Sequence, residues 1–168
     1  MAILLPYIKV TEAYAEVLSH WFNAVCAEPT FARVPFPKQP PEHFKILMQT
    51  EPNHGVGENG VLEAAILGSG AVFYIFLVDK SLPPKRTFQA ALSVMYWTLH
   101  KALESGLAEI SWEQDVDNTF LAWVNEVLPP LRKVVCSRNG ATGEIRTHMV
   151  TLDVRKALSD CEKKLRRL

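Results

Sequence analysis

The stretch FLVDKSLPPKRTFQAALSVMYWTLHKALESG, residues 76–106, joins an apolar strand to a long helix through a short cationic turn. The strand belongs to the run AVFYIFLVD, whose continuous apolar pattern predicts that both of its faces are covered, as in the centre of a sheet. The helix is predicted from Thr87 to Ser105, with an apolar stripe at helical spacing and Gly106 as its terminator. Connections of this form often bind phosphate groups, although their turns are usually rich in glycine.

Length and composition are typical of one globular domain, which we expect to span residues 1–168, since 48% of the residues are hydrophobic. The formal net charge is zero, whereas nucleic-acid binders usually carry a basic excess, so no nucleic-acid partner is expected. The three cysteines, Cys26, Cys136 and Cys161, are far apart, which predicts neither a disulfide framework nor a metal site. No apolar run has the length of a signal peptide or a membrane span, so we expect a cytoplasmic protein without a membrane partner.

Upstream of this stretch, the sequence predicts an edge strand at ILLPYIKV and a helix that Thr11 caps. The proline-rich residues 27–44 are expected to form an extended surface connection that overlaps a short helix beginning at Pro41. Residues 51–60, EPNHGVGENG, are predicted to be a loop, and VLEAAILG and AVFYIFLVD are predicted to form either a hairpin or two adjacent strands.

Downstream, LAEISWEQ alternates as a strand does, with Ile110 and Trp112 on one face. TFLAWVNEVL is predicted to be a short helix that Asp117 or Asn118 caps. Two strands are expected around the turn NGATG, and residues 155–168 are predicted to form an amphipathic C-terminal helix. The element order predicts an α/β protein with one mixed sheet and helices on its faces.

This order, and the spacing from Leu62 to Val154, resembles the GNAT superfamily of acetyl-coenzyme A-dependent N-acetyltransferases. The resemblance implies a mixed, mostly antiparallel central sheet, in which the parallel fourth and fifth strands splay, with helices on both faces and here an extra C-terminal helix. In the family, the fourth strand leads into arginine or glutamine, two variable residues, glycine, one variable residue, and glycine or alanine. The backbone N–H groups of that motif hold the pyrophosphate of the coenzyme at a helix N-terminus.

In this chain Pro83 takes the arginine position of the motif, Pro84 takes the variable position after it, and Arg86 and Phe88 take the two glycine positions. Pro84 lacks an N–H donor and Phe88 adds bulk, whereas the Lys85 and Arg86 side chains would bind phosphate themselves. The turn is therefore either a pyrophosphate site or a cationic turn at a helix start. The resemblance implies cofactor contacts, to acetyl-CoA as cosubstrate, at Leu77, Val78, Lys85, Arg86, Thr87, Phe88, Gln89 and Asn118.

The candidate catalytic and pantetheine-binding residues lie at the end of the fifth predicted strand and in the segment that follows it. Asn118 takes the position of an asparagine that contacts the pantetheine arm in many members of the family, and the alternative for it is a helix cap. Asn125 takes the position of the tyrosine that serves as general acid in some members, and a carboxamide cannot donate a proton to a thiolate as a phenol can. Glu113 is the candidate catalytic base, with a solvated strand-end carboxylate as the alternative.

Three hypotheses follow. The first is an acetyl-CoA-dependent N-acetyltransferase for an unknown amine, with residues 31–41 and 52–60 shaping the acceptor pocket. The second is a catalytically inactive GNAT-like structural or binding protein, such as a phage-type accessory protein, which the missing glycines and tyrosine favour. The third is an unrelated α/β binding protein that shares the element order by chance. The amphipathic tail favours assembly with a partner or with a second copy, and the latter would be a homodimer.

Overall fold

The computed structural model describes residues 4–26, 39–49, 52–69 and 72–168. Strands and helices alternate along the chain largely as the sequence predicts. They are β1 (Tyr7–Lys9), the 3-10 helix η1 (Glu12–Tyr14), α1 (Ala15–Cys26), α2 (Pro41–Leu47), β2 (Asn53–Glu58), β3 (Val61–Ser69), β4 (Val72–Val78), α3 (Pro84–Glu104), β5 (Glu109–Asp115), α4 (Thr119–Val127), β6 (Arg132–Arg138), β7 (Ile145–Asp153) and α5 (Val154–Arg167).

The strands form one sheet in the order β1-β2-β3-β4-β5-β7-β6. All neighbouring strands are antiparallel except β4 and β5, which are parallel. The predicted mixed, mostly antiparallel sheet is therefore confirmed. β1 lies at one edge, as Pro6 indicates, and the apolar strand β4 lies in the centre, as its continuous hydrophobic pattern predicts.

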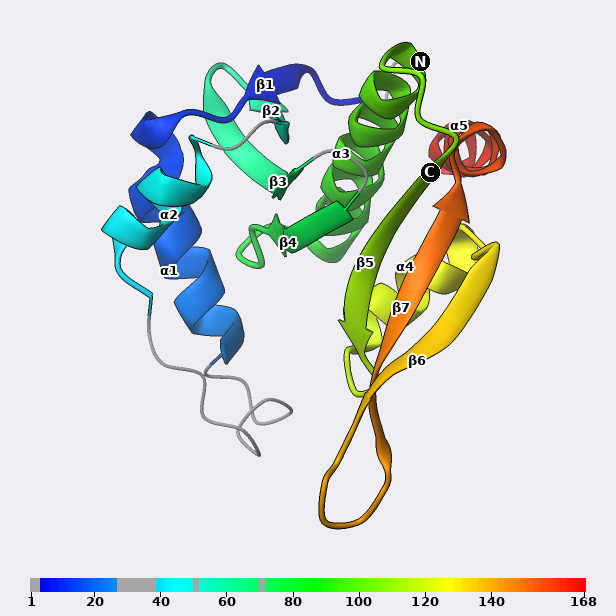
Figure 1. Cartoon of the computed structure of the whole chain (residues 1–168). Helices are drawn as coiled ribbons and strands as arrows, with labels where there is room; N and C mark the ends of the chain where they lie inside the picture. Colours follow the sequence, from blue (N-terminus) through cyan, green and yellow to red (C-terminus); the bar gives the residue numbers. More distant parts are fainter. Residues whose placement is uncertain (1–3, 27–38, 50–51, 70–71) are drawn as a thin grey trace.

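Helices cover both faces of the sheet (Figure 1). On one face, Leu18, Trp21 and Phe44 of α1 and α2 pack against Leu67 and Leu77 of the central strands. On the other face α3, α4 and α5 share a larger core with the sheet, whose buried members include Leu92, Met95, Leu99, Ile110, Val124, Leu152 and Leu165. The two-faced packing explains why β4 needs apolar residues at successive positions.

α3 begins at Pro84, three residues before the predicted start at Thr87. Proline suits the first turn of a helix, because an N–H group at that position has no intrahelical partner. The helix ends as predicted, since Gly106 has a φ of 80° and Leu107 N–H donates to the Ala102 carbonyl over 2.9 Å. A left-handed residue that closes the last turn in this way is the usual end of a helix.

The prediction of a loop over residues 51–60 is wrong, because Asn53–Glu58 form β2 between β1 and β3. The glycines of this segment favour a loop, because glycine has a low strand propensity. In β2 the neighbouring strand β3 requires glycine at position 57, since a Cβ atom there would lie 1.8 Å from the Val61 carbonyl oxygen. The tight turn that follows uses positive φ angles at Asn59 and Gly60.

The tail helix α5 packs within its own chain. Its apolar stripe is buried against α3, where the Cys161 thiol donates to the Leu92 carbonyl over 3.2 Å. Burial raises the pKa of that thiol to about 12. The stripe is thus already covered, so it gives no support to the predicted assembly with a second copy, which stays a prediction.

Two further predictions concern the chain before β2. The short helix expected from Pro41 is confirmed as α2. The extended connection predicted for residues 27–44 falls largely on residues 27–38, which lie outside the described residues, as does most of the 31–41 segment assigned to the acceptor pocket. No helix in the described ranges is long and apolar enough to cross a membrane.

Candidate functional site

A wedge-shaped gap opens between the carboxyl ends of β4 and β5. Among the described residues, the two strands pair only at Val72 with Ser111 and at Phe73 with Trp112. Beyond these pairs β5 continues along β7, and in the described part of the chain residues 76–78 of β4 have no strand partner on the side that faces β5. The two strands diverge visibly in Figure 1. The predicted splay of the parallel strands is therefore present.

A hollow of about 80 Å³ lies in this gap. Residues 76–78 of β4 form one wall, and residues 117–120, which lead from β5 into α4, form another. Thr87 of α3 and Val25 of α1 also line it. The fold thus brings together four residues predicted to contact the cofactor, namely Leu77, Val78, Thr87 and Asn118.

A second hollow of about 480 Å³ adjoins the first and runs between the first turns of α3 and α4. The two share the lining residues Lys80, Thr87, Thr119 and Phe120. Phe88 and Trp123 also line the second hollow, with their ring centroids 4.6 Å apart. We call the two hollows together the splay groove. It leads from the gap between the strands past the N-terminus of α3.

No family model matches the sequence, and no curated protein matches it either. Solved structures do match the fold. The yncA protein of Salmonella typhimurium, solved with its cofactor acetyl-CoA, has a TM-score of 0.66 at 9% identity over 89% of this chain and 94% of its own. An N-acetyltransferase of Staphylococcus aureus has a TM-score of 0.65 at 11% identity over 89% of this chain and 98% of its own.

A GCN5-related N-acetyltransferase of Rhodopseudomonas palustris has a TM-score of 0.63 at 12% identity, over 89% of this chain and 95% of its own. The chain has the GNAT fold. The likeness to these proteins therefore extends beyond the element order to the arrangement of the strands and helices. Identities this low establish the GNAT fold and leave the activity to be argued from the site.

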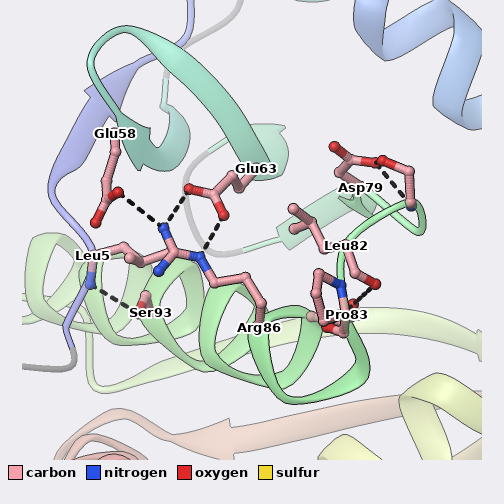
Figure 2. A network of polar contacts seen from close by, with 10 residues as sticks. Leu5, Glu58, Glu63, Asp79, Leu82, Pro83, Arg86 and Ser93 are labelled. Carbon is pink, nitrogen blue, oxygen red and sulfur yellow. Dashed lines mark hydrogen bonds and ion pairs between the residues drawn. The ribbon is translucent and has the colours of Figure 1, made fainter.

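Arg86 is bound to the sheet of the GNAT fold rather than to the splay groove (Figure 2). Its Nε and Nη2 donate to the two carboxylate oxygens of Glu63 over 2.6 and 2.8 Å. A carboxylate oxygen of Glu58 lies 3.3 Å from the same Nη2. Glu63 is only 6% exposed, and the hydrogen bond from Arg86 to Glu63 raises the pKa of the guanidinium. The pair ties the first turn of α3 to the β2–β3 hairpin. Arg86 lines neither hollow of the groove.

The turn before α3 closes on itself. The Ser81 N–H and hydroxyl both donate to the Asp79 carboxylate, and the Thr87 hydroxyl lies within hydrogen-bond distance of the Leu82 and Pro83 carbonyls. The first helical hydrogen bond runs from Thr87 N–H to the Pro83 carbonyl. The N–H groups of Lys85 and Arg86 precede that bond, and such groups at a helix start favour an anion. The Lys85 side chain is exposed beside them.

The two remaining predicted residues of the motif have different surroundings. The Phe88 side chain is 37% exposed and packs on Trp123, so its ring forms a wall of the splay groove. Gln89 is half-buried and does not line the groove. The Phe88 ring, at a glycine position of the motif, thus lies at the side of the groove and against α4.

Asn118 caps α4, as one of its two interpretations predicts. Its side-chain oxygen accepts a hydrogen bond from the Leu121 N–H over 2.9 Å. The same residue lines the gap between β4 and β5. The cap is therefore observed, and the contact to a pantetheine arm stays a prediction that its position allows.

Glu113, the candidate base, lies on the face of β5 opposite the buried side chains of Trp112 and Gln114. It is exposed and accepts a hydrogen bond from the Thr147 hydroxyl over 2.8 Å. Its hydrogen bond with Cys136 raises the pKa of that thiol. Glu113 does not line the splay groove, so the strand β5 lies between this carboxylate and the side covered by α4.

Asn125, at the position of the family tyrosine, is engaged with β5. Its amide nitrogen donates to Gln114 Oε1 over 3.1 Å, and the Trp112 indole donates to the same oxygen over 3.0 Å. The Asn125 side-chain oxygen is buried without a hydrogen-bond partner in the described part of the chain. None of these groups can serve as an acid near neutral pH.

Sequence reasoning missed the aromatic pair that narrows the gap. Phe76 and Phe120 contact each other edge to face, with ring centroids 5.3 Å apart, and both line the first hollow. Lys80 and Thr119 were missed as well. Their sequence position could have indicated Thr119 and Phe120 as lining residues, because they immediately follow Asn118 at the start of a helix.

Proposed function

We propose that the chain is an acetyl-CoA-dependent N-acetyltransferase acting on an amine acceptor. The observation that carries the proposal is the splay groove, which begins between β4 and β5 and passes the start of α3. It combines an edge of β4 at residues 76–78 with which no described strand pairs, the polar side chains of Thr87 and Asn118, and the N-terminus of a long helix.

The residues present suit the parts of the coenzyme unequally. An extended arm that carries amide groups can pair with this edge of β4 as an added strand does, at Leu77 and Val78. The N–H groups at the start of α3 and the Lys85 ammonium favour a diphosphate. Arg86 contributes indirectly, because its charge offsets one of the two negative charges of Glu58 and Glu63 and so reduces the repulsion of phosphate groups near this turn.

Acetyl-CoA would supply the acetyl group as an activated thioester. The chain would then have to remove a proton from the attacking amine. Glu113 is the proposed base, directly or through a water molecule, because its carboxylate is exposed on the side of β5 that α4 leaves uncovered. The hydrogen bond from Thr147 orients one of its oxygens.

Calorimetric titration with acetyl-CoA tests the binding part of the proposal. Thr119 is exposed and lines both hollows, so Thr119→Trp should fill the groove without disturbing the core. The matched control is Ser159→Trp at an exposed position of α5. We expect saturable heat for the natural sequence and the control, and none for Thr119→Trp. A natural sequence that gives no heat at high micromolar acetyl-CoA contradicts the proposal.

Turnover needs a separate assay, in which a panel of amines is screened for release of the coenzyme thiol. Glu113→Gln keeps an oxygen that can accept from Thr147 but cannot take up a proton. We expect this change to abolish most of the turnover while the affinity for acetyl-CoA stays the same. Glu144→Gln, in the exposed β6–β7 turn, is the control.

A second candidate function is a GNAT-fold binding or structural protein that does not catalyse. Two observations favour it, namely the Arg86–Glu63 pair at a glycine position of the motif and the carboxamide of Asn125 at the position of the acid. Binding of acetyl-CoA without thiol release from any amine would support this candidate over the first. Thiol release that depends on Glu113 would exclude it.

A further inference from the structure

A larger hollow of about 630 Å³ lies at the opposite end of α3 from the splay groove. The last turns of α3 form one side of it, through Thr98, Lys101 and Ser105. Residues from each of β1 to β5 form the other side. Its volume lies within the range of small-molecule sites, and it shares no lining residue with either hollow of the groove.

One wall of this hollow is apolar and held in place. It includes Ile66, Phe73 and Ile110, which are between 1% and 7% exposed. Phe73 stacks on Trp112 with ring centroids 5.5 Å apart and an interplanar angle of 3°. Since these side chains belong to the packed core, they offer a preformed surface to an apolar group and need no rearrangement to bind it.

The rim beside β1 carries a positive charge on an aromatic platform. The Lys101 ammonium lies over the Tyr7 ring, 5.0 Å from its centroid. That ring also contacts Trp97, and the Tyr7 hydroxyl is hydrogen-bonded to Nδ1 of the buried His54 over 2.9 Å. The platform thus fixes the place of the ammonium at the mouth of the hollow.

The charge of Lys101 is not used in an ion pair among the described residues. Glu104, one turn further along the helix, instead contacts His100 over 2.8 Å. The carbonyl groups at the C-terminus of α3 add partial negative charge around Ser105. Lys9 and Glu104 also line the hollow, so its charged lining residues are two lysines and one carboxylate, and this balance suits a ligand with one negative charge.

We propose that this hollow binds a small amphipathic monocarboxylate. The carboxylate would lie on the Lys101 ammonium, and its aromatic or aliphatic body would lie against Ile66, Phe73 and Ile110. The site is independent of the proposed acetyl transfer, because it is formed by the other end of α3.

The test uses the full chain and two probes of the same shape, 3-phenylpropanoate and its neutral amide, 3-phenylpropanamide. Binding is followed by chemical-shift titration of the backbone amides at low salt. We expect the carboxylate to bind about tenfold more tightly than the amide, with the shifts centred on Phe73, Ala102 and Ile110. Lys101→Met should remove this preference and leave binding of the amide unchanged. Lys45→Met on α2, which packs on the other face of the sheet, should retain it.

A salt titration of the natural sequence provides a measurement that does not depend on a variant. The preference for the carboxylate should shrink as added salt screens Lys101. The proposal is overturned if neither probe binds at millimolar concentration, if the amide binds as tightly as the carboxylate, or if Lys101→Met keeps the preference. It is also overturned if the shifts centre on Leu77 and Asn118, because the probe would then occupy the splay groove.

Discussion

The two ends of α3 use their cationic side chains in opposite ways. At the first turn Arg86 donates to Glu63 and lies close to Glu58, so its charge is neutralised within the fold. Near the last turn Lys101 lies over the ring of Tyr7, and no described carboxylate pairs with it. Arg86 of the cationic turn thus binds the sheet, whereas Lys101, near the other end of the helix, faces a hollow.

The difference follows from what lies opposite each end. The β2–β3 hairpin presents two carboxylates to the start of α3, and a buried carboxylate such as Glu63 needs a cation with hydrogen bonds. The C-terminal end of α3 faces aromatic and aliphatic side chains instead. The role of a charged residue on this helix is therefore decided by the strand that it faces.

Arg86→Ala should have the largest effect on stability, because it leaves Glu63 buried without its partner. We expect a loss of about 3 kcal/mol in the free energy of unfolding. Urea denaturation measures it. The double variant Arg86→Met with Glu63→Met should recover most of the loss, since it removes both charges. A single variant that is as stable as the natural sequence would mean that the N-terminal ion pair does not hold α3.

Gly106→Ala tests the opposite end of the helix. The left-handed φ of 80° is strained for alanine, and we expect a loss of about 1.5 kcal/mol. Because Ser105 and Leu107 line the hollow beside Lys101, binding of 3-phenylpropanoate should weaken as well. Gly140→Ala serves as the control, since Gly140 has open space around its Cα and no positive φ. Equal effects of the two substitutions in thermal unfolding would argue against strain at Gly106.

Asn118→Ala separates a helix cap from a ligand contact. Loss of the cap should cost about 1 kcal/mol of stability. Asp153→Ala removes the equivalent cap of α5, where the carboxylate accepts from the Lys156 N–H over 2.8 Å. Both variants should lose similar stability by urea denaturation, but only Asn118→Ala should weaken acetyl-CoA binding in the calorimeter. If both keep full affinity, Asn118 is a cap and nothing more.

Lys85→Ala should have the smallest effect on stability. A cation in the first turn opposes the helix dipole, so its removal should stabilise the chain by about 0.3 kcal/mol. The affinity for acetyl-CoA should nevertheless fall, because Lys85 is the cation of this turn that the fold leaves exposed. Thermal unfolding with and without acetyl-CoA measures both effects. A variant that keeps the full ligand-induced shift in midpoint would remove Lys85 from the proposed phosphate contacts.

Much of the candidate site was predictable because it depends on local sequence. Leu77, Val78, Thr87 and Asn118, which the family resemblance places at the cofactor, line one hollow, and their contact with the cofactor stays a prediction. The ion pair of Arg86 could not be predicted from local sequence, since its partner Glu63 lies 23 residues earlier and is brought close only by the sheet. The direction of the Phe88 ring, against Trp123, likewise depends on the packing of α4 on α3.

Several elements could be predicted from short stretches of sequence because their signals are local. Apolar alternation gave β5, Asn118 began α4, Gly106 ended α3, and the turn after Arg138 joined β6 to β7. Each of these depends on the conformational preferences of a few neighbouring residues, which the sequence displays directly.

Tertiary structure alone decided three features. β2 forms because β1 and β3 pair with both of its edges and require glycine at Gly57, although glycine disfavours an isolated strand. Arg86 serves the sheet because the β2–β3 hairpin brings Glu63 to it. The hollow at Lys101 exists because strands from distant parts of the chain meet the end of α3. In each case the decisive partner is remote in sequence, so no local preference of the residue could reveal it.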